Sequence, residues 1–158
     1  MKRKNLLAVL AAFAATLSLA LPVVAADLKS PDLVKNGLRI LAYVQDDMAR
    51  KLPSKSYSRL PHENQEFQEA AVPMREAVAN EPPAFKARVD ALLKKAQAAA
   101  DNVATISATN DEARITAAVQ AVSDALKSLN ELFPEALRPV PGQLGAGPGR
   151  GGPPPDLR

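Results

Sequence analysis

Residues 85–106 read FKARVDALLKKAQAAADNVATI and carry the pattern that decides the fold. Apolar residues recur along this stretch at alternating steps of four and three, at Phe85, Val89, Leu92, Ala96, Ala99, Val103 and Ile106. Steps that average about 3.5 residues place one apolar seam along an α-helix and favour left-handed packing on a neighbouring helix. The stretch therefore predicts a long helix that packs lengthwise in a bundle.

The segment that follows repeats the same pattern. After a predicted turn at 108–110, the apolar residues are Ile115, Val119, Val122, Leu126, Leu129 and Phe133. Asn110, Asp111 and Glu112 supply a capping side chain and acids that suit the start of a helix. Pro134 ends this predicted helix because proline cannot continue the hydrogen-bonding pattern.

Two more amphipathic segments precede residue 85. The first begins at Ser30-Pro31, ends at Pro53 and has apolar residues at Val34, Leu38, Leu41, Val44, Met48 and Leu52. The second begins at Pro61, ends at Pro82-Pro83 and has apolar residues at Phe67, Ala71, Met74 and Val78. Pro73 lies inside the second segment, and it predicts a kink or short break near 69–72.

Four amphipathic helices with short connections predict an all-α fold, an antiparallel up-down-up-down four-helix bundle over residues 27–137. A pair of helical hairpins that completes its core only on dimerisation is the alternative architecture. Residues 138–158 contain six Pro and six Gly, and such a segment buries too little apolar surface to offset its ordering entropy. We therefore expect a disordered tail there.

The N-terminal residues 1–26 have the features of a secretory signal peptide. Basic residues at 2–4 precede an uncharged apolar run at 6–20, and small residues at 24–26 favour cleavage after Ala26. An uncleaved anchor helix is the alternative. We expect a periplasmic protein without membrane attachment after cleavage, or one secreted to the medium.

Composition excludes several functional classes. Loss of three basic residues with the signal peptide leaves 17 basic residues against 17 acidic ones, so the charge does not favour nucleic-acid binding. The chain has no Cys, which excludes disulfides, thiolate metal sites and covalently attached haem. The single His excludes a di-metal centre built from two Glu-x-x-His motifs. No motif for hydrolysis or phosphate binding is present, so we expect a protein that is not an enzyme and binds no haem.

One polar stretch departs from this plain packing pattern. Residues 61–69 read PHENQEFQE and hold the only His together with three acids. At about 100° per residue, His62, Glu66 and Glu69 share one stripe, and Glu63 lies nearer the core edge. In an antiparallel hairpin Asp47 lies at the height of Glu66, because each is five residues from its end of the connection.

Several oxygen ligands therefore converge at the rim of this helix pair. Hard cations such as calcium or a trivalent lanthanide prefer sites of this kind. The candidate ligands are Asp47, Glu63, Glu66 and Glu69. Asp46 and His62 are further candidates, which bind the ion directly or contact the residues that do. The alternative is that the helix dipole favours acids in the first turn without any ligand, and that Glu66 and Glu69 face solvent or pair with Arg50, Lys51 or Arg59.

This combination of signal peptide, Cys-free helical chain and surface acids resembles the small exported helical proteins of lanthanide and other metal uptake systems in methylotrophic bacteria. The resemblance implies a metal chaperone or carrier. The chain departs from EF-hand proteins, since it lacks their D-x-D-x-D-G loops. Because an open site has few protein ligands, we expect water or a second molecule to complete the shell, and hence a metal-dependent homodimer. The alternatives are a periplasmic protein-interaction module, with its basic loop and acidic helix as a docking face, and a haem-type electron carrier.

Overall fold

Four α-helices form in residues 28–140, the part of the chain that this computed structural model describes. They are α1 (Pro31–Lys51), α2 (Leu60–Ala77), α3 (Pro83–Ser107) and α4 (Glu112–Asn130), with short 3-10 helices η1 (Tyr57–Arg59) and η2 (Glu135–Leu137). No strand forms in this range, so the predicted all-α class is confirmed. The predicted signal peptide at 1–26 and residues 141–158 of the predicted tail lie outside the described residues.

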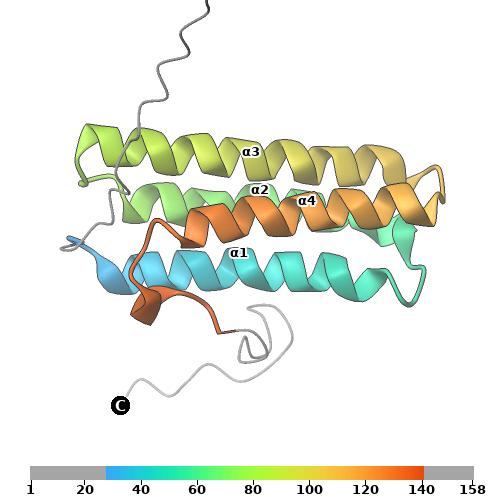
Figure 1. The fold of residues 1–158 in the computed structure, drawn as a ribbon, viewed down its shortest axis with the longest axis horizontal. Coiled ribbons are helices and arrows are strands. Elements are labelled where there is room, and N and C mark those ends of the chain that lie inside the picture. Colours follow the sequence, from blue (N-terminus) through green and yellow to red (C-terminus); the bar gives the residue numbers. More distant parts are fainter. Residues whose placement is uncertain (1–27, 141–158) are drawn as a thin grey trace, which may run out of the picture.

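The helices lie side by side with alternating direction (Figure 1). One contact at each end of the bundle agrees with this order. Lys55 Nζ, between α1 and α2, lies 2.8 Å from Oε2 of Glu112, where α4 begins. At the opposite end, the backbone N–H of Lys29 donates to Oε1 of Glu81, between α2 and α3, at 2.7 Å. The chain is therefore an up-down-up-down antiparallel four-helix bundle, as the sequence predicts.

The core runs the length of the bundle, and every apolar residue predicted for α4 is buried. In α3 the prediction is wrong at two positions: Leu93 and Ala100 are fully buried, whereas Leu92 and Ala99 are only partly buried. The reason is that α3 packs on both α2 and α4, so its buried face is broader than a single seam and includes Leu93 and Ala100 beside the predicted positions.

The helix starts differ in how their backbone groups are satisfied. Oδ1 of Asp111 accepts a hydrogen bond from the N–H of Arg114 at 3.1 Å, so the predicted capping of α4 is confirmed. The side chain of Ser30 makes no such bond, and only its carbonyl accepts from Val34 N, at 3.1 Å. Asn110 has φ 55°, a left-handed conformation that asparagine tolerates at the end of a helix.

Helix α2 continues without a break through Pro73, so a break at 69–72 is not observed. Apolar residues on either side of Pro73, among them Ala71 and Met74, pack into the core and hold the helix together. The two helices of the first hairpin also approach closely here. A Cβ atom added at Gly37 would lie 3.1 Å from Sδ and 3.2 Å from Cα of Met74, so a larger residue here would have to push Met74 away by a few tenths of an ångström.

The packed structure extends past Leu137, where we expected it to end. Nε of Arg138 donates to the carbonyl of Phe133 at 2.9 Å, and Leu137 packs against the core. Phe133 itself meets Phe85 edge to face, with ring centroids 5.6 Å apart. The first residue assigned to the disordered tail is thus attached to the bundle by its side chain.

None of the helices in residues 28–140 combines the length and apolar character needed to cross a membrane.

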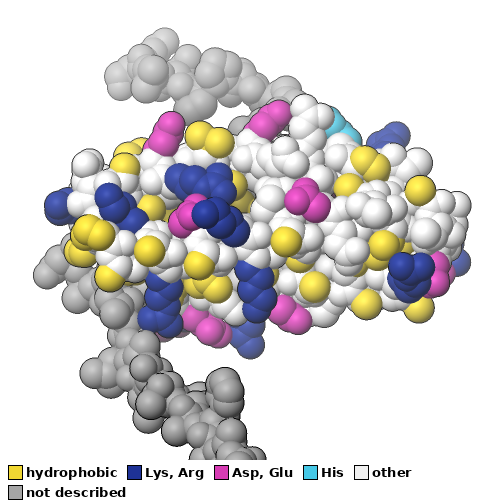
Figure 2. All heavy atoms as spheres, turned by 90° about the horizontal axis from the view of Figure 1, so that it is seen from above, with side chains coloured by type: hydrophobic (Ala, Val, Ile, Leu, Met, Phe, Trp, Pro, Cys, Tyr) yellow, Lys and Arg dark blue, Asp and Glu magenta, His cyan; other side chains and the backbone are white. Residues whose placement is uncertain are grey.

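Basic and acidic side chains are interspersed on the face of the described chain seen in Figure 2. The helical bundle therefore presents charges of both signs on this side, with hydrophobic side chains scattered between them.

Candidate metal site

The acids singled out by the sequence lie where α1 and α2 face each other near their connection. Asp47 is on α1 next to the buried residue Met48, so it projects at the edge of the buried face. Glu63 is in the first turn of α2, and Glu66 lies one turn further on. An acid in the first turn is favoured by the helix dipole, which explains part of this placement without any ligand.

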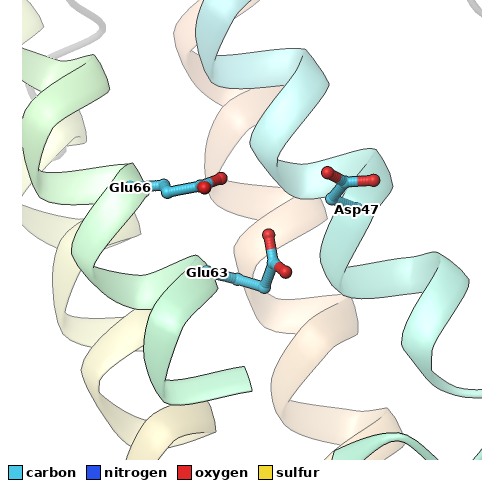
Figure 3. Close-up of side chains that lie close together, drawn as sticks. All are labelled: Asp47, Glu63 and Glu66. Carbon is cyan, nitrogen blue, oxygen red and sulfur yellow. The ribbon is translucent and has the colours of Figure 1, made fainter. Parts of the chain in front are cut away.

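Asp47, Glu63 and Glu66 each place one carboxylate oxygen within 4.8 Å of those of the other two. Figure 3 shows the two glutamates reaching from α2 towards α1, where Asp47 lies. Asp47 and Glu66 therefore lie at the same height along α1 and α2, as the residue count on either side of the connection predicts. We call these three residues the acidic triad.

Glu63 is the buried member of the acidic triad, with only 4% of its surface exposed. Its Oε1 lies 3.2 Å from Nζ of Lys51, the last residue of α1. Its Oε2 is buried and has no hydrogen-bond partner. A buried polar atom without a partner costs on the order of 1–3 kcal/mol, and more when the group is charged. One oxygen of Glu63 thus lacks the interaction that its environment demands.

Asp47 is partly neutralised from the solvent side. Its Oδ1 accepts hydrogen bonds from Nε and Nη2 of Arg50, three residues later in α1. This bond with Asp47 is the largest cause of the raised pKa of Arg50. The guanidinium also lies 5.8 Å from the ring centroid of Tyr43 and is 59% exposed. The arginine therefore folds back along α1 and engages Asp47 at the surface.

Glu66 is less well compensated. Partial burial raises its pKa, and the neighbouring charges of Glu63 and Asp47 raise it further. His62 and Lys51 oppose this rise, and Nε2 of His62 lies 3.1 Å from Oε1 of Glu66. His62 is largely exposed, so solvent weakens this ion pair. The raised pKa shows that negative charge is held at some cost in the acidic triad.

The other candidate ligands lie outside the acidic triad. Glu69 is exposed, and its Oε1 accepts a long hydrogen bond of 3.4 Å from Nε2 of Gln65. Asp46 is half-buried but is not part of the group of three. His62 reaches the acidic triad only through its contact with Glu66. Of the six predicted ligands, the structure brings three together.

Two buried or half-buried polar groups, Lys51 at the site and Tyr57 in the connection between α1 and α2, were not assigned a role at the site from the sequence. Lys51 appeared there only as an exposed partner for Glu66 or Glu69, yet it pairs with buried Glu63. Its position four residues after Asp47, on the same side of α1, is the signal that indicates it. Tyr57 in η1 is buried, and its hydroxyl has no hydrogen-bond partner.

The geometry of the acidic triad is compatible with a hard cation. Two oxygens that share one calcium ion at roughly 2.4 Å lie at most about 4.8 Å apart. The three carboxylates supply fewer ligands than the six to eight oxygens that calcium takes, so water has to provide the others. Asp47 and Glu66 are partly exposed, and water has access to that side.

A pocket of about 190 Å³ lies elsewhere, between α1 and α4. Apolar residues such as Leu38 and Leu126 line it together with Gln45, whose Nε2 donates to Ser123 Oγ at 2.8 Å. Pockets for drug-sized ligands measure roughly 300–1,000 Å³. The space is small for a ligand site and is better explained by the looser packing of α1 on α4.

Comparisons with protein-family profiles, with curated proteins and with solved structures find no match.

Proposed function

We propose that this protein is a non-enzymatic metal-binding protein, a carrier or chaperone, that holds a hard cation such as calcium or a lanthanide at Asp47, Glu63 and Glu66. The observation that carries the proposal is the buried Oε2 of Glu63, which has no partner and belongs to a group of three carboxylates. A cation between α1 and α2 supplies the missing interaction.

Electrostatics favour the same ligand. The acidic triad carries three negative charges when ionised, and its nearest cations are Lys51 and Arg50. Stacked carboxylates repel, which accounts for part of the raised pKa of Glu66. A bound cation removes this repulsion, and a trivalent ion removes it more completely than a divalent one.

The ligand set points to a weak or moderate site. All donors are carboxylate oxygens, which suit calcium and lanthanide ions rather than softer metals. Three protein ligands and a partly exposed rim leave several positions to water, as in extracellular calcium modules with Kd on the order of 10⁻⁴–10⁻³ M. A lanthanide of similar size binds more tightly because of its higher charge. These affinities suit a carrier that gives up its ion. The predicted signal peptide supports the proposal that this carrier works in the periplasm.

The direct test is titration of the purified protein, without a histidine tag, with terbium by luminescence and with calcium by calorimetry. Glu63→Gln keeps the shape of the side chain and removes its charge, so we expect at least about tenfold weaker binding. The matched control is Asp90→Asn on α3, which removes one acidic charge outside the acidic triad. It should leave both affinities unchanged.

The outcomes separate the alternatives. Binding that is equally weakened in both variants indicates a non-specific effect of net charge and contradicts the site. No binding of either ion at millimolar concentration contradicts the function and leaves the protein-interaction module and the haem-type electron carrier as the remaining hypotheses. Size-exclusion chromatography with and without terbium shows whether a second copy, rather than water, completes the coordination.

A further inference from the structure

The side chain of Lys51 is much less exposed to water than the side chains of Lys55 and Lys94. Its side chain is 15% exposed, against 68% for Lys55 and 73% for Lys94, both of which also form ion pairs. Lysine is seldom buried unless it is paired, and the partner of Lys51 is the carboxylate of Glu63, itself 6% exposed. This ion pair belongs to the interior edge of the acidic triad.

We propose that Lys51 is the built-in counter-ion of the metal site and sets both its affinity and its preference between divalent and trivalent ions. The inference rests on the proposed metal-binding function and adds a residue that is not a ligand. In the absence of metal, the ammonium group neutralises Glu63 and lets three carboxylates remain close together. When a cation binds, the same positive charge opposes it.

The two oxygens of Glu63 explain why Lys51 opposes the ion without blocking it. Oε1 is taken by Lys51 Nζ at 3.2 Å, whereas Oε2 has no partner. A cation that binds Oε2 therefore lies across a single carboxylate group from the ammonium. The side chains of both partners are largely shielded from water, so the repulsion between the two cations is screened less than at the surface.

Neither Arg50 nor His62, the other partners of the acidic triad, can have the same role to the same degree. Arg50 pairs with Asp47, but its side chain is 59% exposed and lies along the outside of α1. His62 pairs with Glu66 and is 68% exposed. Solvent screens charges at such positions, and their side chains are free to move away from an incoming ion.

The repulsion between Lys51 and a bound ion can be recognised from its dependence on the charge of the ion, because Coulomb energy is proportional to that charge. Removing the charge of Lys51 should tighten the binding of a trivalent ion more than that of a divalent ion. The logarithms of the two affinity changes should stand in a ratio of about three to two. A change that only altered the shape of the site would have no reason to follow this ratio.

The experiment compares Lys51→Met, Lys51→Arg and the remote control Lys94→Met by terbium and calcium titration at one ionic strength. For Lys51→Met we expect about tenfold tighter terbium binding and about fivefold tighter calcium binding. Lys51→Arg keeps the charge and should stay close to the wild type, as should Lys94→Met. If Lys51→Met does not fold, Lys51→Gln removes the charge while keeping a hydrogen-bond donor.

Failure of the two proposals can be told apart. A wild-type protein that binds neither ion contradicts the proposed function. A wild-type protein that binds, combined with a charge-free Lys51 variant that binds no more tightly, contradicts the counter-ion role and leaves the function intact. Equal tightening for terbium and calcium also contradicts it, because the effect would then not depend on ion charge.

Discussion

Two groups of acids in the same bundle have opposite electrostatic environments. On the side where α2 meets α3, Asp90 lies 2.7 Å from Nζ of Lys94 and 3.3 Å from Nε of Arg75. Hydrogen bonds from these two cations lower the pKa of Asp90. In the acidic triad between α1 and α2, burial and like charges raise the pKa of Glu66. One acid is stabilised as an anion, and the other is destabilised.

Structural acids and candidate ligands can be distinguished by the partners of their carboxylate oxygens. Asp101, on the α2–α3 side, accepts hydrogen bonds from Asn64 and Gln97 at 3.1 and 2.9 Å. Like Asp90, it has partners within the protein and needs no ion. Glu63 has a cation on one oxygen and nothing on the other. The buried Oε2 of Glu63 without a partner, rather than acidity, distinguishes the acidic triad.

The largest effect should come from removing the counter-ion of Glu63 in the metal-free protein. Lys51→Met leaves a buried carboxylate next to two other acids, and we expect a loss of about 2 kcal/mol of unfolding free energy. Urea denaturation in the presence of a chelator measures it. The control Lys94→Met breaks an exposed pair and should cost about 0.5 kcal/mol or less. Equal losses in the two variants would show that the two regions do not differ as described.

A smaller effect of opposite sign should follow from Glu66→Gln. Neutralising Glu66 removes repulsion from Glu63 and Asp47, so the metal-free protein should gain about 0.5–1 kcal/mol at neutral pH. The matched control is Glu69→Gln, an exposed acid on the same helix outside the acidic triad, which should change stability little. A loss of stability in Glu66→Gln would mean that the pair with His62 outweighs the repulsion.

The fold follows from the sequence because period and proline signals are local. The apolar steps along residues 85–106 and 115–133 are set by the geometry of one helix, and prolines mark most of the connections. The exact phase of α3 does not follow, since Leu92 and Leu93 are both apolar and adjacent. Only the positions of α2 and α4 decide which of the two leucines is fully buried.

The acidic triad follows from the sequence only in part. Counting residues on both sides of the connection predicts that Asp47 and Glu66 lie at one height, and the structure places them together. The counting cannot say that Glu69 remains in solvent or that Lys51 turns inward to Glu63. Both depend on side-chain rotamers and on how far the two helices are rotated about their axes.

The smallest change in stability is expected at Asp90, and its pH dependence tests whether Asp90 and the acidic triad differ electrostatically. Because the folded-state pKa of Asp90 is lowered, its ion pairs stabilise the protein above the unfolded-state pKa, and this stabilisation is lost as pH falls through the folded-state value. Asp90→Asn should therefore cost about 0.5 kcal/mol at neutral pH, since the pairs are exposed and screened. The difference from the wild type should shrink as the pH falls below roughly 4, the unfolded-state value, and disappear once the pH is below the lowered folded-state pKa. Denaturation at both pH values measures this. A cost that persists in acid would mean that Asp90 acts through packing rather than charge, and its contrast with the acidic triad would no longer be electrostatic.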